Sequence, residues 1–203
     1  MKQCLALLAL LILAACAGPD FSGSRAPRDL SLAEAESAGR GVAIVGLEAR
    51  AGGVDTMLQL DQVELTWQPL DPNGTPMILS APGCAEPERA PTPCAGERMS
   101  YFVLTAPGGI YALDHLAVKL ARGIRVRSFE GAERREIVLF AGAIAYLGDF
   151  TFDPQQDELV AYTRGDTGAL AALRRYPYLR GPVSFVQPTA PGTPRATPQF
   201  IAP

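Results

Sequence analysis

The chain has 203 residues, of which 21 are acidic and 18 are basic, giving a net charge of −3. This mild acidity argues against a nucleic-acid-binding protein, because such proteins need clustered lysine and arginine side chains. Even without an N-terminal leader, the length fits one domain with a hydrophobic core.

The first fifteen residues have the pattern of a secretory signal peptide. Lys2 supplies a positive charge, and residues 4–15 are all apolar or small (CLALLALLILAA). This run is too short to cross a bilayer as a helix, which takes about 20 apolar residues. Pro19 ends helical structure soon after it. We therefore expect residues 1–15 to be removed.

The end of this leader, Leu13-Ala14-Ala15-Cys16, resembles the lipobox of bacterial lipoproteins. The resemblance implies that the Cys16 thiol receives a diacylglyceryl group and that, after cleavage, the new amino group is acylated by palmitate or a similar chain. Several acyl chains on one residue anchor a protein stably. Ala17 in place of an aspartate implies sorting to the outer membrane, with the domain facing the periplasm. The alternative is an ordinary signal peptide that happens to precede a cysteine.

Cys84 and Cys94 remain after Cys4 leaves with the signal peptide and Cys16 takes the lipid. An even pair of cysteines in an oxidising compartment predicts a disulfide. Closing the proline-rich loop between them would stabilise the fold by roughly 3 kcal/mol on the chain-entropy account. The alternatives are two free thiols or a metal pair, but the spacing is wider than CxxC and the chain has a single histidine.

The remaining chain divides into three parts. We expect residues 16–30 to be the lipidated cysteine and a flexible tether, residues 31–186 a single domain, and residues 187–203 a disordered, proline-rich tail. One short helix is predicted at about 31–38, because Ser31 and Glu34 have capping-box spacing and Gly39 follows. A second is predicted from Asp166, as its N-cap, to about residue 176, with Leu170 and Leu173 facing inward.

The body of the chain is β-rich. Strands are predicted at 42–47, 57–67, 77–79 (at a sheet edge), 99–106, 110–120, 124–129, 136–140, 144–152 and 158–164. The apolar parity switches at Asp61-Gln62 and again within 110–120, which indicates β-bulges. Residues 99–106 are apolar on both faces, as in a central strand. Residues 124–129 and 136–140 are predicted to form a hairpin.

The segment 144–152 has the clearest alternation, with Ile144, Tyr146, Phe150 and Phe152 on one parity. Short strands separated by turns favour an antiparallel β-sandwich or barrel. The fold predicted is therefore mainly β, with one or two short helices.

Two segments resemble motifs of transthyretin-like (prealbumin-like) and carboxypeptidase-regulatory-like sandwiches, which occur in bacterial envelope lipoproteins. Residues 106–113 (APGGIYAL) are similar to the proline-glycine-tyrosine hairpin of those sandwiches, with an additional residue before Tyr111. Residues 142–150 (GAIAYLGDF) are similar to a strand with the order glycine, small apolar, tyrosine, glycine and aspartate. The resemblance covers about residues 42–178. It implies an antiparallel β-sandwich and no particular reaction.

His115 is the only histidine, and Asp114 stands beside it. Adjacent residues of a strand face opposite sides, so the two form an orienting pair only if a bulge lies there. His115 is either the general base of an envelope hydrolase, working with an acidic residue, or a polar residue at a sheet surface. No cofactor is expected. The acidic run at 149–158 is interpreted as a calcium site or as a solvated loop.

An aromatic and basic cluster lies near the end of the domain: Tyr176, Tyr178, Arg174, Arg175 and Arg180. It either grips an acidic envelope protein or a glycan, or its tyrosines cover the sandwich edge while the arginines face water. The sequence thus predicts a non-enzymatic binding or envelope-structural lipoprotein, held by membrane lipid through acylated Cys16. An envelope hydrolase using His115 is the alternative.

The variant Cys16→Ser tests the predicted anchor. It should abolish acylation and release or mislocalise the protein, because the thiol is the acceptor of the diacylglyceryl group. Acyl labelling and fractionation of envelopes measure both effects. Persistent membrane attachment of the variant would contradict the prediction.

Overall fold

The computed structural model describes residues 24–49, 60–83, 95, 98–120, 123–153, 158–194 and 197–201. Within these ranges the chain is mainly β, and its strands form a six-stranded and a five-stranded sheet. The six-stranded sheet comprises β1 (Arg40–Ala49), β4 (Ser100–Pro107), β8 (Ile144–Asp153), β9 (Glu158–Thr163), β10 (Val183–Phe185) and β11 (Gln199–Ile201). The five-stranded sheet comprises β2 (Leu60–Pro69), β3 (Met77–Pro82), β5 (Gly109–Leu120), β6 (Gly123–Ser128) and β7 (Glu136–Leu139).

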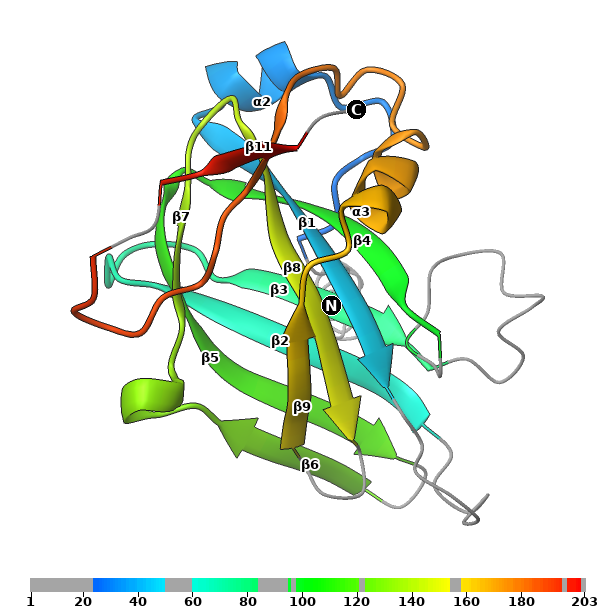
Figure 1. Cartoon of the computed structure of the whole chain (residues 1–203), viewed down its shortest axis with the longest axis vertical. Coiled ribbons are helices and arrows are strands. Elements are labelled where there is room, and N and C mark those ends of the chain that lie inside the picture. Colours follow the sequence, from blue (N-terminus) through cyan, green and yellow to red (C-terminus); the bar gives the residue numbers. More distant parts are fainter. Residues whose placement is uncertain are drawn as a thin grey trace, which may run out of the picture.

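Figure 1 shows the two sheets as layers, with the six-stranded sheet in front of the five-stranded one. The strand order is β11-β10-β8-β1-β4 in the first, with β9 also on β8, and β3-β2-β5-β6 in the second, with β7 also on β5. All pairs of the five-stranded sheet are antiparallel. In the six-stranded sheet, β8 pairs in parallel with β1 and with β10. The predicted antiparallel pattern therefore holds for one sheet, whereas the other is mixed.

The main hydrophobic core fills the space between the two sheets. Trp67, the single tryptophan of the chain, is 1% exposed there, and its ring packs edge-on against Phe150 of the opposite sheet at 6.0 Å. On β5, five residues of the two predicted parities all reach this core: Tyr111, Leu113, Leu116, Val118 and Leu120. They do so because the register between β2 and β5 shifts at Asp114, which confirms the predicted bulge. A second shift at Asp61 confirms the other one.

Strand β8 changes face at a bulge of its own. Along β1, Ile44 pairs with Tyr146 but Gly46 pairs with Asp149, so β8 accommodates one extra residue. Gly148 supplies it, with φ at +102°, a conformation that residues with a Cβ rarely adopt. The predicted shared face is therefore wrong: Phe150 and Phe152 enter the main core, whereas Ile144 and Tyr146 face the outer side of the sheet.

A second apolar cluster covers that outer side. It is built from outward-facing residues of β1, β4, β8 and β10 together with two helices, α2 (Leu32–Ser37) and α3 (Asp166–Leu173). The residues of α3 that are fully buried are Ala169 and Ala172. Their small side chains let the helix lie close to the sheet.

The expected α2 helix is confirmed with its capping box, since Ser31 Oγ accepts from the Glu34 N–H and Glu34 accepts from the Ser31 N–H. The expectation for α3 is wrong in its cap and its end. Gly165, not Asp166, is the N-cap, and the helix ends at Leu173. Asp166 instead pairs with Arg164 at 2.7 Å. Leu170 and Leu173 are partly buried against the second cluster.

The described chain enters the fold between the two sheets. The N–H of Ser24 donates to Ile78 O on β3, and the Thr105 N–H and Ala26 N–H link the same segment to β4. Because β3 and β4 are edge strands of different sheets, residues 24–26 close the gap between them. Residues 24–26, which fall in the range expected to be tether, are thus packed into the fold.

Other sequence expectations also differ from the structure. β4 is an edge strand rather than a central one; it is buried on both faces because the second cluster covers its outer side. β6 and β7 do not form a hairpin but both pair with β5, separated by the short 3-10 helix η1 (Gly131–Glu133). β4 and β5 belong to different sheets, so the Pro107-Gly108 turn joins the two layers.

The described part of the C-terminal tail is ordered, contrary to the expectation. Thr189 exchanges two backbone hydrogen bonds with Glu136, of 2.7 and 3.0 Å. Farther on, β11 pairs with β10 and Ile201 is buried in the second cluster. The proline content of the tail predicted disorder, and no periodic apolar pattern in it signalled the contacts with β7 and β10.

Gly148→Ala should destabilise the protein by about 3 kcal/mol, from strained backbone and from overpacking together. An added Cβ would collide with the Tyr162 ring. Gly39→Ala is the matched control, since Gly39 also has positive φ (+66°) but open space around it, and it should lose only about 1 kcal/mol. Denaturant unfolding followed by Trp67 fluorescence measures both losses. Equal losses would contradict the collision.

Candidate functional site

A buried carboxylate lies under the beginning of α3. Asp149 is 5% exposed on the outer face of the six-stranded sheet. Tyr146 Oη donates to Asp149 Oδ1 at 2.5 Å, and Tyr101 Oη donates to Oδ2 at 3.1 Å. Gly46 and Gly165 line the carboxylate so closely that a Cβ on either would collide with it. The GAIAYLGDF segment of the sequence thus supplies the bulge, one tyrosine and the carboxylate of one buried network.

Burial governs the ionisation of this network. Loss of solvation raises the pKa of Asp149, although the hydrogen bonds from Tyr146 and Tyr101 act in the opposite direction. Burial, with the nearby Asp149 carboxyl, also raises the pKa of both tyrosine hydroxyls. The tyrosines therefore stay protonated donors at ordinary pH.

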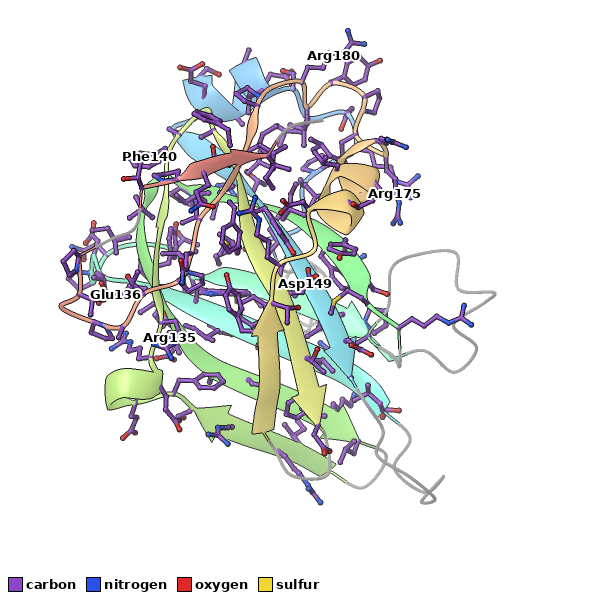
Figure 2. The ribbon with its side chains drawn as sticks, in the orientation of Figure 1. Arg135, Glu136, Phe140, Asp149, Arg175 and Arg180 are labelled. Atoms are coloured by element: carbon purple, nitrogen blue, oxygen red, sulfur yellow. The ribbon has the colours of Figure 1, made fainter. Side chains whose placement is uncertain are left out.

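The same network holds α3 in place. The N–H of Gly165, the N-cap residue, donates to Tyr146 Oη at 2.7 Å, and Tyr101 Oη lies 3.4 Å from the Gly165 carbonyl oxygen. α3 is therefore fixed at its first turn to β8 and β4. Arg175 and Tyr176 follow the other end of this helix. Figure 2 shows Asp149 beside the chain that leads into α3 and Arg175 at the far end of that helix.

A cavity of about 200 Å³ lies between α3, β4 and the entry segment. We call it the arginine pocket. Its lining residues are Arg25, Ala26, Arg28, Tyr101, Phe102, Val103, Ala172, Arg175 and Tyr176. Three arginines and two tyrosines line the cavity together with apolar residues, a composition that suits an acidic group attached to a partly apolar body.

The arginines of the pocket differ in their bonding. Arg25 Nη2 donates to Ser80 O at 3.3 Å, and its guanidinium stacks over the Phe102 ring at 5.3 Å. Arg28 and Arg175 are exposed, and neither forms an ion pair with any residue that the structure describes. This holds even though Asp29 is the neighbour of Arg28. These two side chains are therefore available to an anion.

The aromatic and basic cluster expected from the sequence is divided by the structure. Arg175 and Tyr176 line the arginine pocket. Arg174 is exposed outside it, Tyr178 is 59% exposed, and the Arg180 Nε donates to the Pro177 carbonyl at 3.0 Å. Figure 2 shows Arg175 and Arg180 on the same side of the molecule, away from Phe140 and Glu136.

Of the nine residues that line the pocket, sequence reasoning named two as site residues, Arg175 and Tyr176. Arg25 and Arg28 fall in the expected tether, and Tyr101 in an apolar strand. Only the antiparallel bridge between Arg25 and Leu104 brings the entry segment beside β4. No local pattern near Arg28 signals that contact.

His115 contacts Asp114 because of the bulge in β5. Its Nδ1 lies 3.1 Å from Asp114 Oδ2, and its Nε2 lies 3.9 Å from Glu64 Oε1. Both ring nitrogens therefore face carboxylates. Among the described residues, no hydroxyl group hydrogen-bonds to the ring, although Ser128 is its cross-strand neighbour on β6.

Two further cavities lie elsewhere. An apolar groove of about 410 Å³ runs between β7 and the C-terminal segment, beside Phe140 and Val186. A hollow of about 480 Å³ lies at the Pro107–Tyr111 turn. The described ranges contain no group of three or more histidine, cysteine, aspartate or glutamate residues suited to a metal ion. None of the helices within those ranges is both long enough and apolar enough to cross a membrane.

Cys16, Cys84 and Cys94 lie outside the described residues. The residues next to the predicted disulfide are described, however. Gly83 and Ala95 form a parallel bridge, and the Ala95 N–H donates to Pro82 O at 2.7 Å. The two ends of the loop that contains both cysteines are thus held together.

No protein-family model matches the chain, and no curated protein matches it either. Among solved structures, a leucine-rich repeat protein from Bacteroides thetaiotaomicron is similar over 63% of this chain, with 10% sequence identity and a TM-score of 0.31. The chain spans 14% of the length of that protein. At this TM-score the similarity carries no argument about fold or function.

Asp149→Asn tests the buried carboxylate through pH. Since the folded-state pKa of Asp149 is raised, the folded protein keeps a proton that the unfolded chain releases near its ordinary pKa of 3.8. The contribution of Asp149 to stability therefore falls as pH rises from 3.8 through the raised pKa, by at most about 1.4 kcal/mol per pH unit. The variant should lack this decline.

Unfolding free energies of both proteins, measured over this pH window, supply the comparison. The difference in slope is the readout, because the amide alters the overall stability at every pH. Identical slopes would contradict a raised pKa of Asp149.

Proposed function

We propose that this protein is a bacterial envelope lipoprotein whose β domain binds an acidic group without catalysis. Acylated Cys16 anchors it in the outer membrane, with the domain facing the periplasm. The arginine pocket is the binding site, and its target is an acidic group of the envelope, carried by a protein, a glycan or a lipid. The observation that carries the proposal is that Arg28, Arg175 and Tyr176 line one cavity, and that both arginines are exposed and form no ion pair with any described residue.

Arg28 and Arg175 line the same cavity although the chain as a whole has a net charge of −3. Two positive charges that line one cavity repel each other, and an anion bound between them removes that repulsion. Guanidinium groups bind carboxylates, sulfates and phosphates through paired hydrogen bonds. The Asp149 network holds α3 rigidly, which lowers the entropic cost of assembling the pocket on binding.

We also propose a transthyretin-like type for the two-sheet fold, and a disulfide between Cys84 and Cys94. Two packed β sheets support the first. The Gly83–Ala95 bridge supports the second, because each cysteine adjoins one of these paired residues. The disulfide would then reinforce the contact between Gly83 and Ala95, the two ends of the loop, next to β3.

Affinity capture from intact envelopes tests the binding function. The full lipidated chain should enrich an acidic component, and Arg28→Ala/Arg175→Ala should lose about 90% or more of it, since each charged hydrogen bond contributes about 1.5–3 kcal/mol. Arg174→Ala is the matched control, because Arg174 is exposed on the same helix end but does not line the pocket. Equal capture by the double variant would contradict the assignment of the site.

An envelope hydrolase using His115 is the second candidate. The 3.1 Å contact between His115 and Asp114 favours it, since a carboxylate orients a catalytic imidazole in this way. The position of Glu64 on the other side of the ring weighs against it, because Nε2 then has no described nucleophile to activate. Because we propose binding without catalysis, we expect His115→Ala to leave every envelope phenotype and hydrolytic activity unchanged. Loss of an activity in that variant, with capture intact, would favour the hydrolase.

A further inference from the structure

We propose that the acidic group taken by the arginine pocket is the phosphate of an anionic phospholipid in the membrane that holds Cys16. The domain would then dock on the bilayer beside its own anchor. This inference rests on the proposed function, because it names the source of the acidic group.

The chain itself places the pocket near the membrane. Arg25, Ala26 and Arg28 are among its lining residues, and they are also among the first described residues after the anchor. Seven residues, 17–23, separate Cys16 from Ser24. Even a fully extended chain of this length keeps Ser24 within about 28 Å of Cys16.

The entry segment cannot swing away from the domain. Its backbone is hydrogen-bonded on both sides, to Ile78 on β3 and to Val103 and Thr105 on β4. The tether therefore starts from a fixed edge of the fold, and the pocket lies at that edge. Of the three cavities described above, this one is lined by the entry segment.

The chemistry of the pocket fits a headgroup phosphate. Arg28 and Arg175 are free to form paired hydrogen bonds with phosphate oxygens, whereas Arg25 is held by Ser80 and Phe102 as part of the wall. A cavity of about 200 Å³ has room for a phosphate group, because a single water takes about 30 Å³. Val103 and Ala172 also line the pocket, and their apolar side chains suit the carbon atoms next to such a phosphate.

The surface around the pocket has the composition of a membrane-facing surface. Arg180 is exposed close to it in the chain and adds positive charge. Tyr176 lines the pocket, and Tyr178, two residues farther along the chain, is 59% exposed. Tyrosine is enriched at the headgroup level of membranes, where an apolar ring and a polar hydroxyl are both satisfied. Arginines near an anionic surface add attraction that salt weakens.

Vesicle binding by the chain from residue 16 onward, carrying Cys16→Ser so that no acyl chain contributes, tests the inference. The chain should sediment with vesicles of phosphatidylcholine and phosphatidylglycerol in equal parts, and not with phosphatidylcholine alone. Arg28→Ala/Arg175→Ala should weaken this binding by about tenfold or more, whereas Arg174→Ala should retain most of it. Trp67 fluorescence confirms that each variant is folded.

Three results would overturn the inference. Equal binding to both kinds of vesicle would show that headgroup charge is not recognised. An equal loss in Arg174→Ala would show general attraction rather than the pocket. Binding of inorganic phosphate or glycerol phosphate in solution, without vesicle binding, would assign the pocket to a soluble anion. Pocket-dependent capture from envelopes would then persist, so the proposed function would stand while this inference failed.

Discussion

Asp149 accepts hydrogen bonds from Tyr146 and Tyr101 in a space that Gly46 and Gly165 keep open. This network attaches the start of α3 to the six-stranded sheet. The carboxylate reaches this position only because Gly148 adds one residue to β8, which turns Tyr146 and Asp149 outward and Phe150 inward. Tyr146 in turn receives the N–H of Gly165, so the start of α3 is bonded to the sheet. Burying a carboxyl group costs free energy unless it is hydrogen-bonded, and here the same bonds that satisfy it position the helix.

The second constraint is the entry segment, which joins edge strands of two different sheets. Edge strands expose unpaired N–H and C=O groups, and residues 24–26 satisfy several of them on both β3 and β4. The first described residues after the proposed anchor, 24–26, therefore stabilise the two-layer fold. Arg28 and Arg175, 147 positions apart in the chain numbering, meet in one pocket as a consequence of both constraints.

Parts of the fold were predictable because their causes are local. Ser31 and Glu34 are close enough in sequence to form a capping box on any helix that starts there. The parity switches around Asp61 and Asp114 revealed bulges, since alternation reports which side chains face the core. Pairing was less predictable. The sequence of β6 and β7 predicts a hairpin, but both strands pair with β5. In the proline-rich tail, β11 pairs with β10 and Ile201 is buried in the second cluster.

The sequence by itself determined that the chain has the pattern of a lipidated leader, that its body is mainly β, and where single strands bend. These features depend on neighbouring residues and on alternation along one strand. Only the tertiary structure decided that Arg28 and Arg175 share a cavity with Tyr101 and Tyr176, and that His115 stands between two carboxylates. The reason is physical: such contacts depend on which strands become neighbours, and that choice is made by the burial of the whole core rather than by any one segment.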